Sequence, residues 1–282
     1  MSTSAAVEQR HGMKAVVLKA FGAEAEVLPE RGALVSRWAV AGDELLYLDA
    51  ATVVDRSKNV RGGVPVLFPV AGRVKGPLSF GGKPVALEQH GFARKRAFEV
   101  AELSSDDATA RVAMRLVADE QTRAVFPFEF DFDVIVTLEA QRLTVELVVK
   151  NTGAAAMPVH LGLHPYFRVP AELKAKASVK ATATRAFDLV SGAEGPWAAP
   201  KLDGPEVNLH LLDAEPAATL VRGDGKRVQV DSSAEMHGLV FWTTPGQPFV
   251  CVEPWSDPVD TFGKRALGPG ETAAFASAFT VS

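Results

Sequence analysis

Four short segments of this 282-residue chain place charged or polar side chains among apolar residues, glycines and prolines. Burying a histidine, an arginine or a glutamate is costly unless the group is paired or used in chemistry. Titratable side chains within such segments are therefore the candidates for a functional site. The segments are residues 61–73 (RGGVPVLFPVAGR), 89–94 (QHGFAR), 160–167 (HLGLHPYF) and 249–255 (FVCVEPW).

His164 and Glu253 form the candidate proton-transfer pair, and each directly precedes a proline. A proline holds the residue before it in an extended backbone, which restricts where that side chain points. Glu253 also ends an apolar run and precedes Trp255, a setting that raises a carboxyl pKa toward the range of a general base. A core histidine and a surface carboxylate are the structural alternative, but this environment favours an acid/base pair.

His160 and His164 have the HxxxH spacing that binds zinc when it lies on a helix. Pro158, Gly162 and Pro165 argue against a helix. On a strand, residues four apart are separated by about 13 Å, at roughly 3.3 Å per residue. One ion does not bridge that distance, so we expect no metal site and an activity that survives chelation.

Other catalytic patterns are absent or undetermined. The chain has no GxSxG elbow, P-loop or Rossmann fingerprint. Cys251 is the sole cysteine, which excludes an intramolecular disulfide, and its apolar neighbours predict a strand rather than the electropositive loop of a nucleophile. The two carboxylates of a glycosidase cannot be identified from sequence, so that alternative stays open.

The composition is that of a soluble protein with a sizeable core: 47% of residues are hydrophobic and 23% are charged. The formal net charge is −4 and the basic residues are scattered, so we expect no nucleic-acid partner. Residues 1–12 are too polar for a signal peptide, and no run approaches the roughly 20 apolar residues of a membrane span. We therefore expect a cytoplasmic protein without a membrane partner.

The elements that position these residues are predicted to be strands. Residues 33–40, 110–117 and 128–136 alternate apolar and polar side chains with a period of two, and 143–149 follows as the second strand of a hairpin. Glycine and proline punctuate the whole chain, and no long window has a helical stripe. We predict an all-β fold, a large antiparallel β-sandwich, with a flexible tail over residues 1–12 and a single domain over 13–282.

The four segments, in this order, resemble the aldose 1-epimerase (galactose mutarotase-like) superfamily, in particular its bacterial branch with Gly-Arg and His-Gly-Phe-Ala-Arg signatures. The resemblance covers nearly the whole chain. It implies a large antiparallel β-sandwich with an open cleft for a sugar and no cofactor. It also implies that His164 is the general acid that protonates the ring oxygen, and that Glu253 is the general base that deprotonates the anomeric hydroxyl.

The same resemblance implies that Arg73 and His90 hydrogen-bond sugar hydroxyls. For Arg73 the alternative is a solvated loop charge, although the planar donor fork of an arginine suits neighbouring oxygens. Three aromatic residues could stack on the sugar or pack in the core: Phe92, Tyr166 and Trp255. Many members carry a further substrate-binding aspartate, but residues 201–208 offer no clear match, so none is assigned.

The substrate class is the open question. The start of the first segment, Arg61-Gly-Gly-Val-Pro, resembles the hexose-6-phosphate mutarotase branch, in which arginines hold the phosphate. Arg61 and Arg94 are the candidates for that role. The Gly-Arg and His-Gly-Phe-Ala-Arg motifs fit the branch that acts on free sugars, and we expect a free hexose as substrate. A hexose-6-phosphate epimerase is the first alternative, and a non-catalytic carbohydrate-binding protein is the second.

Overall fold

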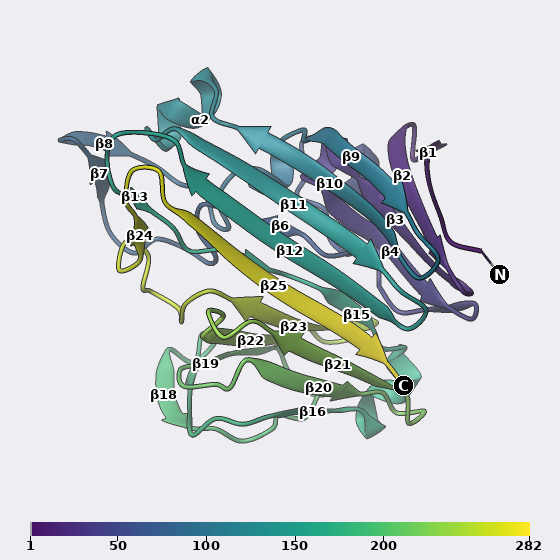
Figure 1. Ribbon diagram of the computed structural model, residues 1–282. Helices are drawn as coiled ribbons and strands as arrows, with labels where there is room; N and C mark the ends of the chain where they lie inside the picture. Colours follow the sequence, from purple (N-terminus) through teal and green to yellow (C-terminus); the bar gives the residue numbers. More distant parts are fainter. Residues whose placement is uncertain (1) are drawn as a thin grey trace.

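The computed structural model describes residues 2–282, and three large β-sheets make up most of it (Figure 1). The first sheet has five strands, in the order β1 (Ser4–Arg10), β2 (Met13–Ala20), β3 (Ala23–Leu28), β4 (Leu34–Val40) and β5 (Asp43–Glu44). The second has eight strands, in the order β16 (Ser178–Ala181), β20 (Ala217–Val221), β21 (Arg227–Ser232), β25 (Thr272–Val281), β12 (Arg142–Asn151), β11 (Phe130–Leu138), β10 (Ala110–Val117) and β9 (Glu99–Ser105).

The third sheet carries the candidate residues. Its order is β18 (Ala193–Pro196), β17 (Arg185–Asp188), β19 (Val207–Leu211), β22 (Gly238–Thr243), β23 (Phe249–Trp255), β14 (Gly162–Leu163) and β6 (Val66–Leu67), and β15 (Tyr166–Arg168) also pairs with β23. Two small pairs are β13 (Met157–Pro158) with β24 (Ala266–Leu267), and β7 (Leu78–Phe80) with β8 (Lys83–Val85). The helices are α1 (Ala50–Val54) and α2 (Glu120–Val125), with 3₁₀ turns at Pro29–Arg31, Ala93–Lys95 and Ala171–Lys176.

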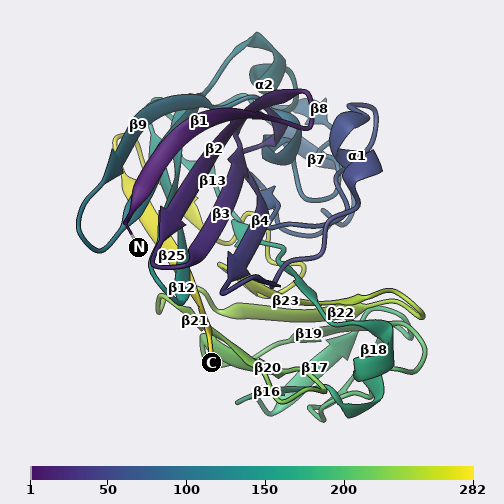
Figure 2. The same cartoon turned by 90° about the vertical axis from the view of Figure 1, so that its right-hand side faces the viewer.

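The named strands of residues 2–282 pair antiparallel, which confirms the all-β antiparallel fold class. Figure 2 shows β1 to β4 packed beside the long strands in the upper half, with β19, β22 and β23 in the lower half. Within residues 2–282, no helix combines the length and the apolar character needed to cross a bilayer.

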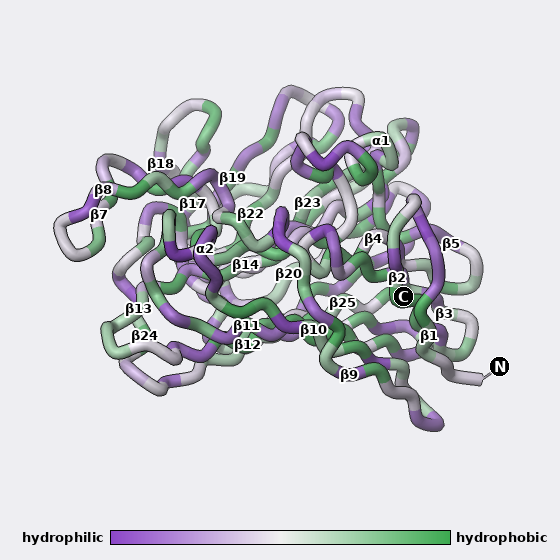
Figure 3. Tube along the Cα trace, turned by 90° about the horizontal axis from the view of Figure 1, so that it is seen from above, coloured by the Kyte–Doolittle hydropathy of each residue, from purple (hydrophilic) through white to green (hydrophobic). Residues whose placement is uncertain are grey.

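The predicted period of two is observed in the long strands. Along β11 and β12, buried residues alternate with partly exposed or exposed ones, and the tube in Figure 3 changes between hydrophobic and hydrophilic colours within single strands. Each fully buried Val or Leu of such a strand contributes about 1.5–3 kcal/mol of transfer free energy. One face of each strand is therefore committed to the core.

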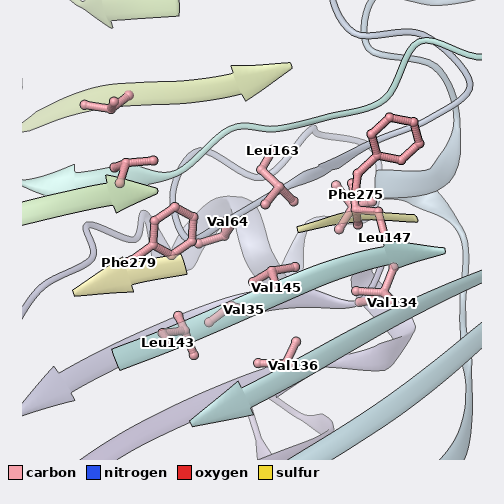
Figure 4. Close-up of a cluster of buried hydrophobic side chains, with 14 of the residues drawn as sticks. Val35, Val64, Val134, Val136, Leu143, Val145, Leu147, Leu163, Phe275 and Phe279 are labelled. Atoms are coloured by element: carbon pink, nitrogen blue, oxygen red, sulfur yellow. The ribbon is translucent and has the colours of Figure 1, made fainter. Parts of the chain in front are cut away.

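One large cluster of buried side chains joins the three sheets. Figure 4 shows part of it, with Val35 of β4, Val136 of β11, Val145 of β12, Leu163 of β14 and Phe279 of β25 pointing toward one another. Because Leu163 belongs to this core, the segment that carries His164 is fixed in place by the packing of the sandwich.

The flexible tail predicted for residues 1–12 is not what the structure has. Ser4–Arg10 forms β1 and pairs with β2 along its length, from Ser4↔Lys19 to Arg10↔Met13. Both faces of β1 are largely exposed, so the strand has no apolar alternation that sequence could reveal. Its position is set by backbone hydrogen bonds to β2, which depend on the neighbouring strand and not on local side chains.

Candidate active site

The pleat of β23 places Glu253 on the face of the third sheet that is turned away from the main core. Val250 and Val252 lie in the core cluster, and successive side chains of a strand point to opposite faces. Cys251 and Glu253 therefore share the other face. That face is also covered, because Glu253 is only 2% exposed.

His164 reaches the same face from β14. Leu163 points into the core, and the backbone N–H of His164 donates to the carbonyl of Pro65 at 3.0 Å. Gly162 of β14 lies opposite Leu67 of β6 on one side and Trp255 of β23 on the other. The segments 61–73 and 249–255 thus flank the segment 160–167, and three of the four sequence motifs become neighbouring strands.

The two catalytic candidates are in contact. His164 Nε2 lies 3.3 Å from Glu253 Oε1, and His164 is 8% exposed. The Tyr166 ring stacks on the imidazole with centroids 4.7 Å apart and planes at 11°, and Trp255 Nε1 donates to Glu253 Oε2 at 3.3 Å. Each member of the pair is therefore oriented by an aromatic neighbour.

Burial decides the protonation of this pair. It raises the pKa of Glu253 well above its usual range, with a smaller opposing effect from the Trp255 hydrogen bond. It lowers the pKa of His164 to about 3, and the positive charge of Arg94 adds to this effect. Both shifts favour the neutral form of each group, so a proton held by the ligand-free pair is favoured on the carboxyl group.

His90 joins the pair through two contacts with the Gly-Arg motif. Its backbone N–H donates to the carbonyl of Gly72 at 2.7 Å, and the N–H of Gly72 donates to His90 Nδ1 at 3.0 Å. Nδ1 must then lack a proton, so the ring is neutral, and His90 Nε2 lies 3.2 Å from the side-chain amide nitrogen of Gln89. Burial, with His164 next, lowers the pKa of His90 well below 6.5. The His90 ring lies edge-on to His164, with centroids 5.4 Å apart.

Gly91 explains why the His90 turn has this sequence. Its φ is +65°, and a Cβ there would lie 2.1 Å from the carbonyl oxygen of Phe68. Only glycine allows so close an approach with a left-handed backbone. The turn is thereby held against the segment that leads into the Gly-Arg motif.

Arg73 and Arg94 both bind Gln89, at the edge of the pair. The exposed Arg73 donates from Nε to Gln89 Oε1 at 3.1 Å, and the half-buried Arg94 donates from Nη2 to the Gln89 carbonyl at 2.7 Å. The charge of Arg94 lowers the pKa of both His164 and His90. Arg94 thus acts on His164 of the candidate pair, and both arginines brace the loop that carries His90.

Arg61 is exposed at the other end of its segment. Burial raises the pKa of Tyr166, and the charges of Arg61 and Arg94 both oppose that rise. The two arginines considered for phosphate therefore act on the same tyrosine.

Two polar residues of β19 face the same side of the third sheet but were not assigned from the sequence. His210 lies opposite Val240, which lies opposite Glu253, so the three share a face. His210 is 4% exposed and its Nε2 donates to Asn208 Oδ1 at 3.2 Å. Its Nδ1 has no hydrogen-bond partner within residues 2–282. The sequence signal was a histidine within an apolar strand segment, although its register could not be known.

The acidic residues near this strand are peripheral. Asp203 and Glu206 are both exposed, and Glu206 accepts a hydrogen bond from Trp242 Nε1 at 3.0 Å. Burial lowers the pKa of His210 to about 4, so this part of the face presents a neutral imidazole.

The aromatic candidates separate into core and site. Phe92 packs against Phe68, with ring centroids 5.7 Å apart, and belongs to the phenylalanine-rich core. Tyr166 and Trp255 contact the catalytic candidates. The expected open cleft is not seen at this pair, because these aromatic rings leave Glu253 almost fully covered. A cavity of about 500 Å³ lies elsewhere, against the first sheet, with Glu26, Arg37 and Glu44 among its lining residues.

The HxxxH histidines do not act together. His160 Nε2 donates to the carbonyl of Asp257 at 2.8 Å, whereas His164 faces Glu253. Among residues 2–282, a different set could hold an ion: one ligand atom each from His164, Cys251 and Glu253, all within 4.8 Å of one another. The sequence did not predict this set, because the apolar neighbours of Cys251 indicate only a strand.

Residues 14–280 match the family model described as aldose 1-epimerase. The crystal structure of Slr1438 from Synechocystis sp. PCC 6803 has a TM-score of 0.89 and 30% identity, covering 99% of this chain and 95% of that one. A galactose mutarotase-like protein from Clostridium acetobutylicum shares the fold, with a TM-score of 0.86, 18% identity, and coverage of 100% and 99%.

A proposed glucose-6-phosphate 1-epimerase of Escherichia coli K12 is 29% identical over 165 residues, which are 58% of this chain and 51% of that protein. The family match spans nearly all strands of the sandwich, including the four segments that form the site. The chain belongs to the aldose 1-epimerase family.

Proposed function

We propose that this protein interconverts the α and β anomers of a free hexose by acid/base ring opening, with His164 and Glu253 as the proton-transfer pair. The observation that carries the proposal is the 3.3 Å contact between His164 Nε2 and Glu253 Oε1 on a covered face of the sheet. A general acid and a general base must stand within hydrogen-bond reach of the two oxygens of one hemiacetal carbon, and this pair is close enough to do so.

The reaction moves one proton in each direction. Glu253 takes the proton from the hydroxyl on C1, and His164 donates a proton to the ring oxygen as the bond from that oxygen to C1 breaks. The open chain then carries an aldehyde at C1 and a hydroxyl at C5. After rotation about the C1–C2 bond, the hydroxyl attacks the other face of the aldehyde, and both protons return.

This assignment needs an ionised Glu253 and a protonated His164, whereas the ligand-free pair holds its proton on the carboxyl group. Sugar binding supplies the compensation. A C1 hydroxyl that donates to the carboxylate favours the ionised form of Glu253, and a ring oxygen that accepts from the imidazolium favours the protonated form of His164. The pair thus needs one proton in total, which the substrate redistributes.

The surrounding residues bind the rest of the sugar in this proposal. His90 lies beside His164, and Arg73 is a donor at the edge. His210 offers an acceptor, Nδ1, on the same face of the sheet. Donors and acceptors of this kind suit sugar hydroxyls.

A hexose-6-phosphate epimerase is the second candidate, because the charges of Arg61 and Arg94 both act on Tyr166, which stacks on His164. The similarity to the proposed glucose-6-phosphate 1-epimerase of E. coli also favours it. Against it, Arg94 is already engaged by the Gln89 carbonyl, a contact that braces the His90 loop. We therefore retain the free hexose as the substrate.

The deciding experiment follows the optical rotation of freshly dissolved α-D-glucose and α-D-galactose, and of glucose 6-phosphate in a coupled assay. We expect kcat/KM for glucose or galactose to be at least equal to that for glucose 6-phosphate. A preference for the phosphorylated sugar would support the second candidate. Sugar binding without acceleration of any of the three would support a non-catalytic carbohydrate-binding protein.

A further inference from the structure

Cys251 stands beside the proton-transfer pair, although the proposed reaction does not use a thiol. It is fully buried and lies two residues before Glu253 on the same face of β23. Directly opposite it is Tyr166 of β15, the ring that stacks on His164. The fold thus brings a sulfur, an imidazole nitrogen and a carboxylate oxygen within 4.8 Å of one another.

This donor set has the chemistry of a zinc site. Zn²⁺ is bound by thiolate, imidazole and carboxylate ligands, in tetrahedral geometry, and open sites have three protein ligands with the fourth position free. A thiolate also disfavours Mg²⁺ and Ca²⁺, which prefer oxygen ligands only. The ligand atoms are slightly farther apart than in a closed zinc site, and small side-chain rotations would bring them together.

The charges of the ion and its ligands balance, as a site buried away from water requires. When Zn²⁺ binds, the thiol of Cys251 and the carboxyl of Glu253 each release one proton to solvent, and His164 remains neutral. The dipositive ion and two anionic ligands then sum to zero, so no uncompensated charge is buried. Burial, and next the charge of Glu253, raise the pKa of the Cys251 thiol, whereas the charges of Lys174 and Arg61 oppose this rise.

We infer that His164, Cys251 and Glu253 form an inhibitory site for Zn²⁺ or a similar thiophilic divalent cation. A bound ion occupies the imidazole and the carboxylate that must move protons, so catalysis stops while the ion is present. Removing the ion with a chelator restores activity. Binding of the metal is independent of the proposed function, whereas inhibition rests on it.

Cobalt tests the site directly. Co²⁺ is titrated into metal-free protein, and the near-ultraviolet thiolate-to-cobalt charge-transfer band is recorded. Because the chain has one cysteine, any such band reports Cys251. We expect one Co²⁺ per chain, displaced by Zn²⁺. Absence of the thiolate band in the parent protein overturns the inference, and this measurement needs no variant.

Variants then test the other ligands. We expect Cys251→Ala to lose the band, and Glu253→Gln or His164→Ala to weaken Co²⁺ binding by at least about tenfold. His237→Ala, which removes an exposed histidine, is the matched control and should bind as the parent does. Unchanged affinity in both the Glu253 and the His164 variant would show binding by the thiol alone and would overturn the three-ligand site.

The inhibition arm uses mutarotation of glucose. Zn²⁺ should inhibit the parent reversibly, and Cys251→Ala should keep its basal activity while the inhibitory Zn²⁺ concentration rises at least about tenfold. Equal sensitivity of the parent and Cys251→Ala would overturn the inhibitory role. If the parent accelerates mutarotation of no sugar, the proposed function fails, and the cobalt titration still decides the metal site.

Discussion

At the scale of single residues, His164 and Glu253 are buried together, which isolates the proton transfer proposed for them from bulk water. We expect His164→Ala and Glu253→Gln each to lower kcat by roughly a hundredfold or more, the usual scale of a lost general acid or base. Sugar binding should persist, because both substitutions leave His90 and the arginines in place. Polarimetry with glucose, together with calorimetric binding, checks this. Near-normal turnover in either variant would rule out the assignment.

The pH dependence follows from the same pair. The active form holds one proton in total, so activity ends on the acid side when His164 gains a second proton, near its pKa of about 3. It ends on the alkaline side when the pair loses its last proton, above the raised pKa of Glu253. We expect kcat/KM to stay level as the pH falls through 6.5, within the range where circular dichroism shows folded protein. A fall centred near 6.5 would indicate an ordinary exposed histidine instead.

Substitution of Arg94 distinguishes a structural role, in which it holds the His90 loop, from a role in phosphate binding. Its hydrogen bond to the Gln89 carbonyl predicts a structural role. We expect Arg94→Ala to change kcat/KM for glucose and glucose 6-phosphate by the same factor and to lower thermal stability by a few degrees, the scale of about 1–2 kcal/mol.

Arg61→Ala provides the comparison, because Arg61 is exposed and is the other phosphate candidate. If either variant weakens apparent hexose-6-phosphate binding by roughly ten- to a hundredfold while glucose is spared, each lost contact was charge-assisted and the substrate is phosphorylated.

At the scale of elements, the short strand β14 positions the pair because it lies between β6 and β23. Gly162 is the point of closest approach: a Cβ there would lie 2.7 Å from Trp255 Cδ1 and 3.2 Å from Ala71 Cβ. Trp255 is buried and donates to Glu253. A small displacement of this indole would therefore move the carboxylate that it orients.

We expect Gly162→Ala to destabilise the fold by about 1–3 kcal/mol through overpacking and to lower kcat/KM at least about tenfold through the shifted carboxylate. Gly195→Ala on β18 is the matched control, because a Cβ there meets nothing within 4 Å. Thermal unfolding and glucose mutarotation measure both effects. Loss of stability with unchanged activity would show that Trp255 does not position Glu253.

At the scale of the whole molecule, four buried histidines make folding sensitive to acid. Burial is the leading cause that lowers the pKa of each one, to about 3 for His164 and about 4 for His210, and His90 and His160 shift in the same direction. The unfolded chain binds their protons near pH 6.5 and the folded chain does not. Their stabilising contribution is thus complete above 6.5 and is lost as the pH falls toward 4 and below.

Glu253 has the opposite effect on the pH dependence of stability, because its raised pKa favours the folded state at low pH. The four histidines outweigh it in number, so we expect the urea midpoint to fall between pH 7.5 and 5. For His210, a pKa of about 4 in place of 6.5 corresponds to roughly 3 kcal/mol over its full titration. His210→Gln should flatten the dependence, and His237→Gln, at an exposed site, should not. A midpoint that does not change with pH would contradict this.

The sequence by itself determined the strands whose alternation is a local property. The predicted run 110–117 coincides with β10, the run 128–136 begins two residues before β11 and overlaps it from Phe130, and 143–149 falls within β12. It also identified the residues of the four motifs, because a polar group set among apolar neighbours is visible without any structure. The strand β1 was not predicted, because it has no buried face and its sequence therefore has no alternation of apolar and polar residues.

Only the tertiary structure decided which residues meet. The register of β19, β22 and β23 aligns His210 with Glu253, and the packing of β14 brings His164 to the same carboxylate. The same packing brings Cys251 Sγ within 4.8 Å of the ligand atoms of His164 and Glu253. Registers between strands that are distant in sequence arise from packing over the whole sandwich, and protonation follows from the resulting burial. A local pattern of residue types therefore determines neither the register between distant strands nor the protonation of the buried groups.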